Sequence, residues 1–343
     1  MRDRPLSLRP AFAGTSASAG AVADASAGLR IHRFAVLTAG ATVCLIVAGG
    51  LVTSTESGLS VPDWPTSYGW SMFTFPVSKW VGGIRFEHTH RLIASAVGLL
   101  TVALAIGLAR REPRAWVRKL GYAALGVIIT QGLLGGLTVL FLLPTAVSVA
   151  HACLAQTFFC LIVALSVVTS PRWRNAEPAP SASIAWVGTS AVVMIFGQLL
   201  LGAVIRHTKA GLAIPDFPLA FGRLVPPISS FGVGIHFAHR VGALAVAALV
   251  GACAVQAFRS ARQGLQKTAA ALTALVLAQI ALGAATVLSR KAVLVTTAHV
   301  VTGALLLGTA LVFTVASLRA GQATERSAAG LGALPAKESL AWK

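Results

Sequence analysis

Four histidines in apolar stretches are the residues of this sequence best placed to do chemistry: His90, His151, His239 and His299. They belong to two copies of one pattern, because His90-Arg91 recurs as His239-Arg240 and Gln131–His151 recurs as Gln279–His299 with the same spacing of twenty residues. An ionisable side chain is costly in hydrocarbon, so histidines kept there are candidate functional residues. Two neutral imidazoles on facing helices can hold a planar metal cofactor, for which haem iron is the leading candidate.

Simpler interpretations of these residues exist. A lone membrane histidine can merely hydrogen-bond to a neighbouring helix, although two matched pairs at equal depth favour ligands. Zinc is disfavoured because no Cys, Asp or Glu cluster with ligand spacing accompanies the pairs.

Glu87 lies three residues before His90, so both side chains share one face of a helix start. An acid at a helix N-terminus is also stabilised by the helix dipole alone. The second copy has His236 at the position of Glu87, and this difference predicts two diverged sites. We predict that Glu87 acts in catalysis, either by stabilising positive charge beside a ring or as a general base.

The elements that position these residues are predicted to be membrane helices. A chain of 343 residues with 56% hydrophobic content, 11% charged residues and mean hydropathy +0.78 is too apolar for a soluble domain. Stretches long enough to cross a hydrocarbon core ~30 Å thick lie near residues 34–54, 87–109, 119–142, 146–168, 183–205, 234–257, 267–289 and 293–318. They lack period-two alternation, so helices are favoured over barrel strands.

The repeat extends into the loops, since Gly49–Gly69 and Gly202–Gly222 share glycine, proline and aspartate at the same offsets. Each half holds four spans, so both halves enter the membrane in the same direction. We therefore predict an all-α polytopic membrane protein with eight transmembrane helices, arranged as two tandem four-helix bundles related by a pseudo-two-fold axis along the membrane normal. At ~1.5 Å per residue, the four imidazoles lie within roughly 10 Å of the outer interface.

The net charge of +18 does not indicate a nucleic-acid partner, because the Lys and Arg residues are concentrated in the segments predicted to lie on one side of the membrane. With the N-terminus in the cytoplasm, 19 of the 28 Lys and Arg residues lie inside and 9 outside. Both termini are thus predicted to be cytoplasmic, in a protein of the cell (inner) membrane whose partner is the lipid bilayer. The predicted organisation is a disordered tail (1–32), an N-terminal bundle (33–170), a cytoplasmic linker (171–182), a C-terminal bundle (183–319) and a second tail (320–343).

Other polar residues have more modest expected roles. Gln131, Gln279, Thr138 and Thr286 are expected to form interhelical hydrogen bonds. Arg91 and Arg240 follow ligand histidines and could pair with haem propionates. His32, His88 and His207 are expected to be interfacial or solvated, and no disulfide is predicted among the four cysteines.

Several runs of residues resemble haem A synthase, a cytochrome oxidase assembly family. They are ESGLSVPDWPTSYG, FEHTHRLIAS, HACLAQTFF, GLAIPDFPLAFG, HFAHRVGAL and TTAHVVTGALLL, which span about Gly49 to Leu307. The resemblance implies an enzyme that oxidises the C8 methyl of haem O to a formyl group, giving haem A. It further implies that Glu87, His90 and His151 form the substrate haem site and that His239 and His299 ligate haem B. Haem O synthase and an electron-transfer protein are candidate partners, and the sequence leaves oligomer formation open.

One departure concerns the outer loops, which lack the cysteine pair that many bacterial relatives carry there. Any electron delivery through outer thiols is therefore doubtful. Two rival functions remain: a bis-histidine di-haem electron-transfer cytochrome, which would not need Glu87, and a transporter, which would need a midplane cavity with broken helices.

Overall fold

The computed structural model describes residues 15–175, 182–260 and 262–331, and its regular elements there are helices. In chain order they are α1 (Thr15–Ser54), η1 (Val77–Lys79), α2 (Ile84–Arg111), α3 (Ala115–Leu140), α4 (Thr145–Thr169), α5 (Pro171–Asn175), α6 (Ala182–His207), η2 (Ala210–Leu212), α7 (Phe231–Arg259), α8 (Gln263–Leu288) and α9 (Val293–Leu331). Eight of them are long and apolar enough to cross a membrane, at the eight places expected. The prediction of an all-α polytopic membrane protein is confirmed.

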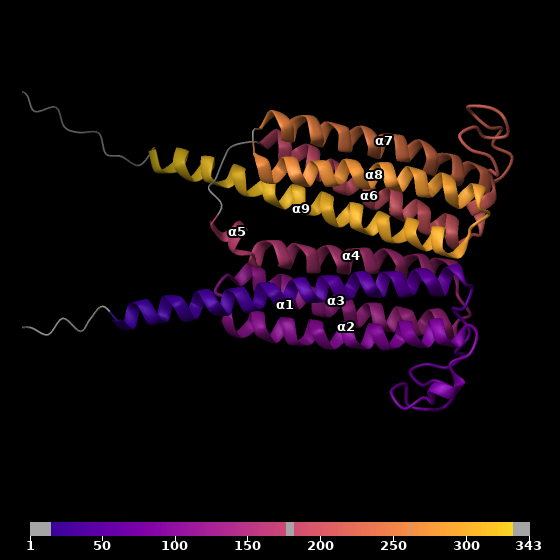
Figure 1. The fold of residues 1–343 in the computed structure, drawn as a ribbon, viewed down its shortest axis with the longest axis horizontal. Helices are drawn as coiled ribbons and strands as arrows, with labels where there is room; N and C mark the ends of the chain where they lie inside the picture. The colour runs from indigo at the N-terminus through magenta and orange to yellow at the C-terminus, as the bar shows by residue number, and fades with distance from the viewer. Residues whose placement is uncertain (1–14, 176–181, 261, 332–343) are drawn as a thin grey trace, which may run out of the picture.

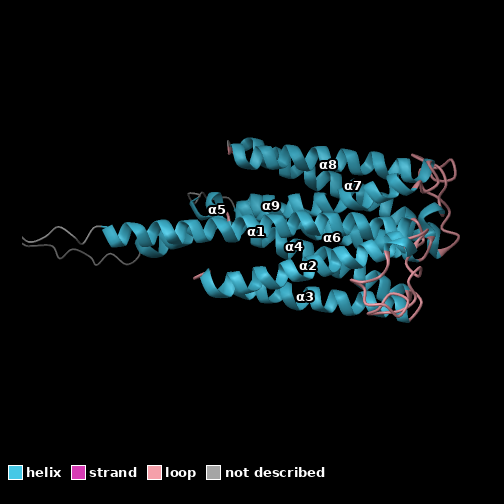
Figure 2. Cartoon of the chain, turned by 60° about the horizontal axis from the view of Figure 1, so that its bottom comes forward, coloured by secondary structure: helices cyan, strands magenta, loops and turns pink. Residues whose placement is uncertain are grey.

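The long helices form two four-helix bundles that lie side by side (Figures 1 and 2). In the first bundle α1 and α3 each pack against α2 and α4, and in the second α6 and α8 each pack against α7 and α9. The bundles meet where α1 and α4 contact α9 and where α4 contacts α6. A pseudo-two-fold axis fits this arrangement and stays a prediction.

The two ends of the molecule differ. The long connections between α1 and α2 and between α6 and α7 lie together at one end, which we call the loop end (Figure 1). The start of α1 and the end of α9 lie at the opposite, terminal end (Figure 1).

The expected domain boundaries at the tails fall inside helices. Helix α1 begins at Thr15, within the predicted tail 1–32, and α9 continues to Leu331, beyond the predicted end of its bundle at 319. Both extensions are rich in alanine, the strongest helix former, so the helices continue past their apolar segments. Part of the linker 171–182 forms α5, whereas residues 176–181 and the tail residues 1–14 and 332–343 lie outside the described residues.

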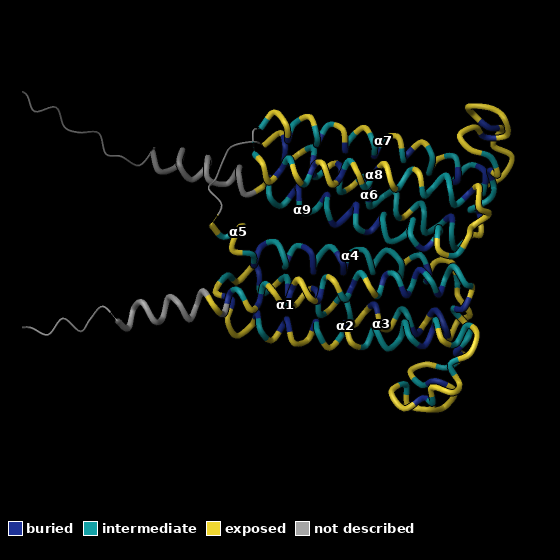
Figure 3. Tube along the Cα trace, viewed as in Figure 1, coloured by how far each residue is buried: buried dark blue, intermediate teal, exposed yellow. Residues whose placement is uncertain are grey.

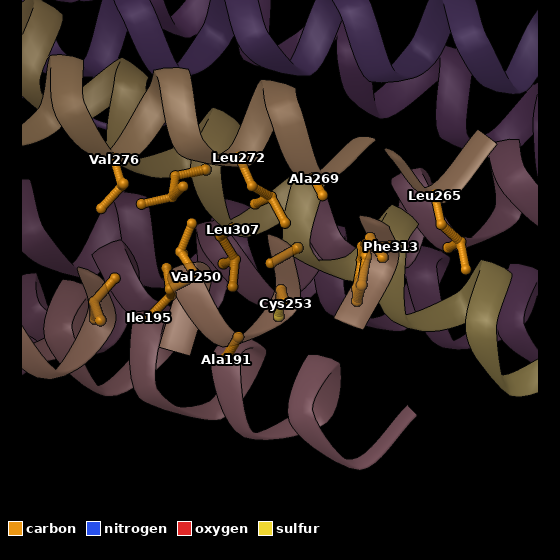
Figure 4. Packing of buried hydrophobic residues seen from close by; sticks show 14 of the residues in the cluster. Ala191, Ile195, Val250, Cys253, Leu265, Ala269, Leu272, Val276, Leu307 and Phe313 are labelled. Carbon is orange, nitrogen blue, oxygen red and sulfur yellow. The ribbon is translucent and has the colours of Figure 1, made fainter. Parts of the chain in front are cut away.

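Fully buried apolar side chains gather toward the terminal end of each bundle. In the second bundle they run from Ile184 to Ile195 on α6, from Val246 to Ala257 on α7, from Leu265 to Val276 on α8 and from Leu306 to Phe313 on α9 (Figure 4). The first bundle has a matching cluster, which includes Leu104, Val117 and Phe158. Toward the loop end most positions are only partly buried (Figure 3), and this is the level at which the four histidines lie. Tight apolar packing therefore holds each bundle together on the terminal side of its histidines.

Candidate functional site

Each of the four histidines lies against a glycine on the preceding long helix of its bundle. A Cβ atom added at Gly49 would come within 3.1 Å of Cε1 of His90, and one added at Gly202 within 3.4 Å of Cε1 of His239. The same relation holds for Gly135 with His151 at 3.1 Å and for Gly283 with His299 at 3.2 Å. A side chain at Gly49, Gly135 or Gly283 would press on the ring and one at Gly202 would touch it, so the four glycines let the imidazoles sit against the helix backbone.

His239 and His299 face each other across the second bundle, one from α7 and one from α9. Their ring centroids are 6.5 Å apart and the ring planes are inclined by 71°. Imidazole nitrogen binds a first-row metal ion at about 2 Å, so two rings that share one ion need centroids roughly 6–7 Å apart. The observed separation therefore fits a pair of axial ligands.

His90 and His151 form the corresponding pair in the first bundle, from α2 and α4. Each ring lies against a glycine of the neighbouring helix, Gly49 on α1 for His90 and Gly135 on α3 for His151. Gln131 donates its Nε2 to the carbonyl of His151 at 3.0 Å and lies 3.4 Å from the ring Nε2 of that residue. In the second bundle Gln279 lies 3.5 Å from Nε2 of His299. The prediction of interhelical hydrogen bonds is confirmed for both glutamines.

The predicted role of the two threonines is wrong. Thr138 donates to the carbonyl of Gly135 and Thr286 to that of Leu282, so each hydroxyl bonds within its own helix. A threonine side chain is short and reaches the carbonyl one turn back more easily than a neighbouring helix.

The histidines meet the chemical requirements of haem ligation. The Nδ1 atoms of His90, His151, His239 and His299 are all buried without a hydrogen-bond partner. Buried polar atoms normally have a partner, so four matched exceptions indicate groups kept for another purpose. No group of three or more metal-ligating side chains occurs in the described part of the chain, whereas a structural zinc site would need four ligands. Pairs of imidazoles are instead the donor set of a six-coordinate haem.

The two long loops repeat one another in detail. Arg91 donates to the carbonyls of Val61, Asp63 and Thr66, at 2.8, 2.7 and 3.0 Å. Arg240 donates to the repeat-related carbonyls of Ile214, Asp216 and Leu219, at 3.1, 2.7 and 2.9 Å. Each guanidinium therefore fastens one of the two long loops beside one of the four histidines. A propionate contact by either arginine stays a prediction.

Aspartate carboxylates shape the same two loops from within. Asp63 accepts the backbone N–H groups of Tyr68 and Gly69, and Asp216 accepts those of Phe221 and Gly222. Partial burial by itself raises the pKa of Asp63, but the hydrogen bonds, led by that from Gly69, hold the pKa below its usual value. Hydrogen bonds from Gly222 and Phe221 likewise lower the pKa of Asp216. Both turns therefore keep a carboxylate at neutral pH.

Glu87 and His236 occupy equivalent places but differ in charge. Glu87 is buried, forms an ion pair with Arg91 at 2.6 Å and accepts the backbone N–H of Val61 at 2.8 Å. His236 is buried and accepts the N–H of Ile214 through Nδ1 at 3.3 Å. Each side chain caps the same loop position, so Glu87 has a positioning role that the sequence did not indicate. The first bundle alone places a carboxylate there.

The expectation for His88 is wrong, because this residue is fully buried rather than interfacial. Its ring packs at 4.7 Å from Trp80 and 5.0 Å from Phe75, and its Nδ1 lies 3.2 Å from the hydroxyl of Ser67. Since the loop from α1 to α2 folds over the start of α2, it covers a side chain that hydropathy places at the membrane surface.

Sequence reasoning also missed residues that contact the site. Gln198 on α6 donates to the carbonyl of His239 at 2.6 Å, and Arg206 reaches from α6 to the first bundle. The glycines were detectable, because Gly135 precedes His151 by the same sixteen residues that separate Gly283 from His299.

Fold and site together define a class of protein: a polytopic helical membrane protein with one partly buried histidine pair in each of two bundles, suited to a planar metal cofactor. The comparisons with known proteins agree, since the chain belongs to the COX15-CtaA family of cytochrome oxidase assembly proteins, which matches residues 71–311.

The similar proteins include bacterial chains named "Heme A synthase". That of Halalkalibacterium halodurans is 31% identical over 78% of this chain and 90% of its own length. That of Symbiobacterium thermophilum is 32% identical over 73% and 84%, and that of Beijerinckia indica is 30% identical over 78% and 88%.

Proposed function

We propose that this protein is a haem A synthase, a membrane oxidoreductase that converts the C8 methyl group of haem O to the formyl group of haem A. The observation that carries the proposal is two matched pairs of imidazoles, each ring with an unpartnered buried Nδ1, at one level of two bundles in a chain of this family. The products of this reaction serve terminal oxidases.

In this proposal the two histidine pairs hold different haems. His90 and His151 hold the substrate haem O, and His239 and His299 hold haem B as a resident cofactor. The difference between Glu87 and His236 supports this assignment, because only the first bundle places a carboxylate where it can act on a reacting substrate. Bound haem B supplies one-electron transfer.

The residues of the chain position the substrate and control its surroundings. His90 and His151 fix the iron, while Gly49 and Gly135 let those rings lie against the helix backbones. Because the ion pair with Arg91 keeps the carboxylate of Glu87 beside the first site, it can stabilise positive charge that develops at the macrocycle edge. The same carboxylate is a candidate base for activating water.

The location and partners complete the proposal. The protein spans the cell membrane with both termini in the cytoplasm, as the distribution of Lys and Arg favours, and the histidines then lie near the outer face. Haem O synthase and an electron-transfer protein are its candidate partners.

Pigment extraction from the purified full-length protein tests the function. Haem O or haem A beside haem B supports a synthase, whereas haem B alone favours the bis-histidine cytochrome and absence of haem leaves transport open. We expect H90A to lose haem O and haem A but keep haem B, and H299A to lose haem B. Loss of the same pigment in both variants would contradict the division between the bundles.

The role of Glu87 is tested by comparing two repeat-related substitutions. Both E87Q and H236Q disturb a cap on an outer loop, but only E87Q removes a carboxylate. We expect E87Q to slow haem A formation by about 10²-fold or more while haem is retained, and H236Q to have a smaller effect. Unchanged haem A formation in E87Q with haem still bound would show that the assignment is wrong.

A further inference from the structure

Arg206 is a guanidinium at the interface of the bundles without an acidic partner. It lies in the last turn of α6, and its Nη2 donates to the carbonyl of Gly50 at 3.0 Å and to the hydroxyl of Ser54 at 2.7 Å, both on α1. The ion pairs of the described residues involve Glu87 and Glu112 and none includes Arg206. Its Nε and Nη1 have no hydrogen-bond partner in the described part of the chain.

An unpaired charge in a membrane helix needs an explanation. Arginines near helix ends often extend into the water layer, where solvent satisfies them. Arg206 instead turns inward and reaches α1 of the other bundle. Charged side chains that face the interior of a membrane bundle normally pair with another group or mark a ligand site.

The position of Arg206 relates it to the second histidine pair. Gly202, which lies against His239, precedes Arg206 by four residues, so both share one face of α6. Arg206 is thus about 6 Å nearer the loop end than the level of the His239 ring. Ser54, which accepts a hydrogen bond from Arg206, also accepts one from Thr297 at 3.1 Å, two residues before His299 on α9. The guanidinium therefore lies toward the loop end from the level of His239 and close to the start of α9, which carries His299.

The first bundle has no equivalent cation. Aligning Gly49 with Gly202 places Thr53 opposite Arg206, and Thr53 only returns a hydrogen bond to the carbonyl of Gly49. The two arginines that flank the ligand histidines, Arg91 and Arg240, are occupied by loop carbonyls. Arg206 is therefore the cation whose free donors best fit an anionic ligand in the second bundle.

We propose that Arg206 binds a propionate carboxylate of the haem held by His239 and His299, and that its charge raises the reduction potential of this haem. The proposal rests on the proposed function, since it requires haem in the second bundle. A guanidinium offers paired N–H donors that match a carboxylate. A nearby positive charge favours the reduced haem, which carries one positive charge less than the oxidised form.

The test measures the haem potential rather than enzyme activity. Spectroelectrochemical titration of the full-length protein loaded with iron protoporphyrin IX is compared for wild type, R206Q and R206K. We expect R206Q to lower the preference for ferrous over ferric haem by about tenfold, equivalent to ~59 mV for one electron, and R206K to restore most of it. Only one of the two haem signals should move.

Two controls separate this role from packing and from general charge. S54A removes the hydroxyl that binds Arg206 on α1 but keeps the guanidinium, and K209Q removes an exposed cation three residues further along. Both should leave the potential near that of wild type. If K209Q lowers the reduction potential as much as R206Q does, the proposed contact between Arg206 and the propionate is refuted.

Loading with the dimethyl ester of the porphyrin identifies the carboxylate itself. The effect of R206Q on the potential should be much smaller with the ester, because a guanidinium without a carboxylate to bind is no longer held beside the haem. An equal shift with acid and ester, or no shift with either while haem remains bound, would overturn the proposal and leave the haem A synthase assignment intact. Failure of wild type to bind haem would instead refute the proposed function.

A variant that loses haem is also informative. If R206Q binds no haem, retention in R206K at the wild-type potential supports the proposal. Loss of haem in S54A as well would assign Arg206 to the joint between the bundles and overturn it.

Discussion

At the scale of single residues, the site depends on the glycines that make room for the imidazole rings as much as on the four histidines themselves. The four histidines were evident from the sequence because a polar side chain is conspicuous in an apolar segment. The glycines that accommodate them leave only the weaker signal of a shared spacing, since glycine is common in membrane helices for several packing reasons. Only coordinates separate Gly135, which touches His151, from Gly126 on the same helix, which has no atom within 4 Å of its added Cβ.

We expect G135A to weaken haem binding in the first bundle. The new methyl would lie 3.1 Å from Cε1 of His151, so the ring must shift by a few tenths of an ångström. Because ligands need tight positioning, haem should dissociate several-fold faster. Transfer of haem to apomyoglobin measures this rate. G126A is the matched control and should be neutral or slightly stabilising, since alanine favours helix by about 1 kcal/mol. Equal rates in the two variants would argue against the contact.

At the scale of elements, the loops and turns contain buried ion pairs that a hydropathy profile does not reveal. The sequence predicted the eight helices from length and composition, but it did not predict the fully buried carboxylate at the end of α2. Glu112 binds Arg114 at 2.6 Å and Arg174 on α5 at 2.7 Å, and Arg114 also donates to the carbonyl of Val168. This network ties the turn from α2 to α3 to the end of α4. A single acid among basic residues gives no periodic signal, so the sequence could not reveal its partners.

We expect E112Q to destabilise the terminal end of the first bundle by about 2–3 kcal/mol, because it leaves two arginines without their carboxylate. The figure lies below the usual value of about 3–5 kcal/mol for a broken buried pair, since the arginine side chains are 25% and 32% exposed. Thermal unfolding in detergent, with R172Q on the exposed face of α5 as control, measures the loss.

The same pair predicts how stability depends on pH. Burial alone raises the pKa of Glu112, but hydrogen bonds from Arg114 and the charges of Arg114 and Arg174 hold it below its usual value. A lowered folded pKa means that the contribution is complete above the unfolded pKa of about 4.3 and is lost as the pH falls through the folded value. The gap in melting temperature between wild type and E112Q should therefore narrow below about pH 4. A gap that is constant from pH 7 to pH 3 would contradict the ion pair.

At the scale of the whole molecule, two bundles place two histidine pairs at one level. The internal repeat and the count of four spans in each half predicted this arrangement, since an even number of crossings preserves direction. The joint between the bundles was beyond prediction, because Ala, Gly, Leu and Val cover every face of these helices. In the structure Ile46, Phe159, Val163 and Ala304 form that joint.

The contact of Phe159 with Gly308 is the sharpest test of the joint. A Cβ atom added at Gly308 would lie 2.8 Å from Cε1 of Phe159, which is 3% exposed and has little room to move. We expect G308A to destabilise the protein by about 1–3 kcal/mol through overpacking, whereas G251A, with nothing within 4 Å, should not. Because a smaller side chain at position 159 makes room for the methyl, F159L should recover part of the loss in G308A although it is destabilising alone. Unfolding of the two single variants and the double variant gives the coupling energy directly. Strictly additive effects would mean that the bundles do not meet at this pair of residues.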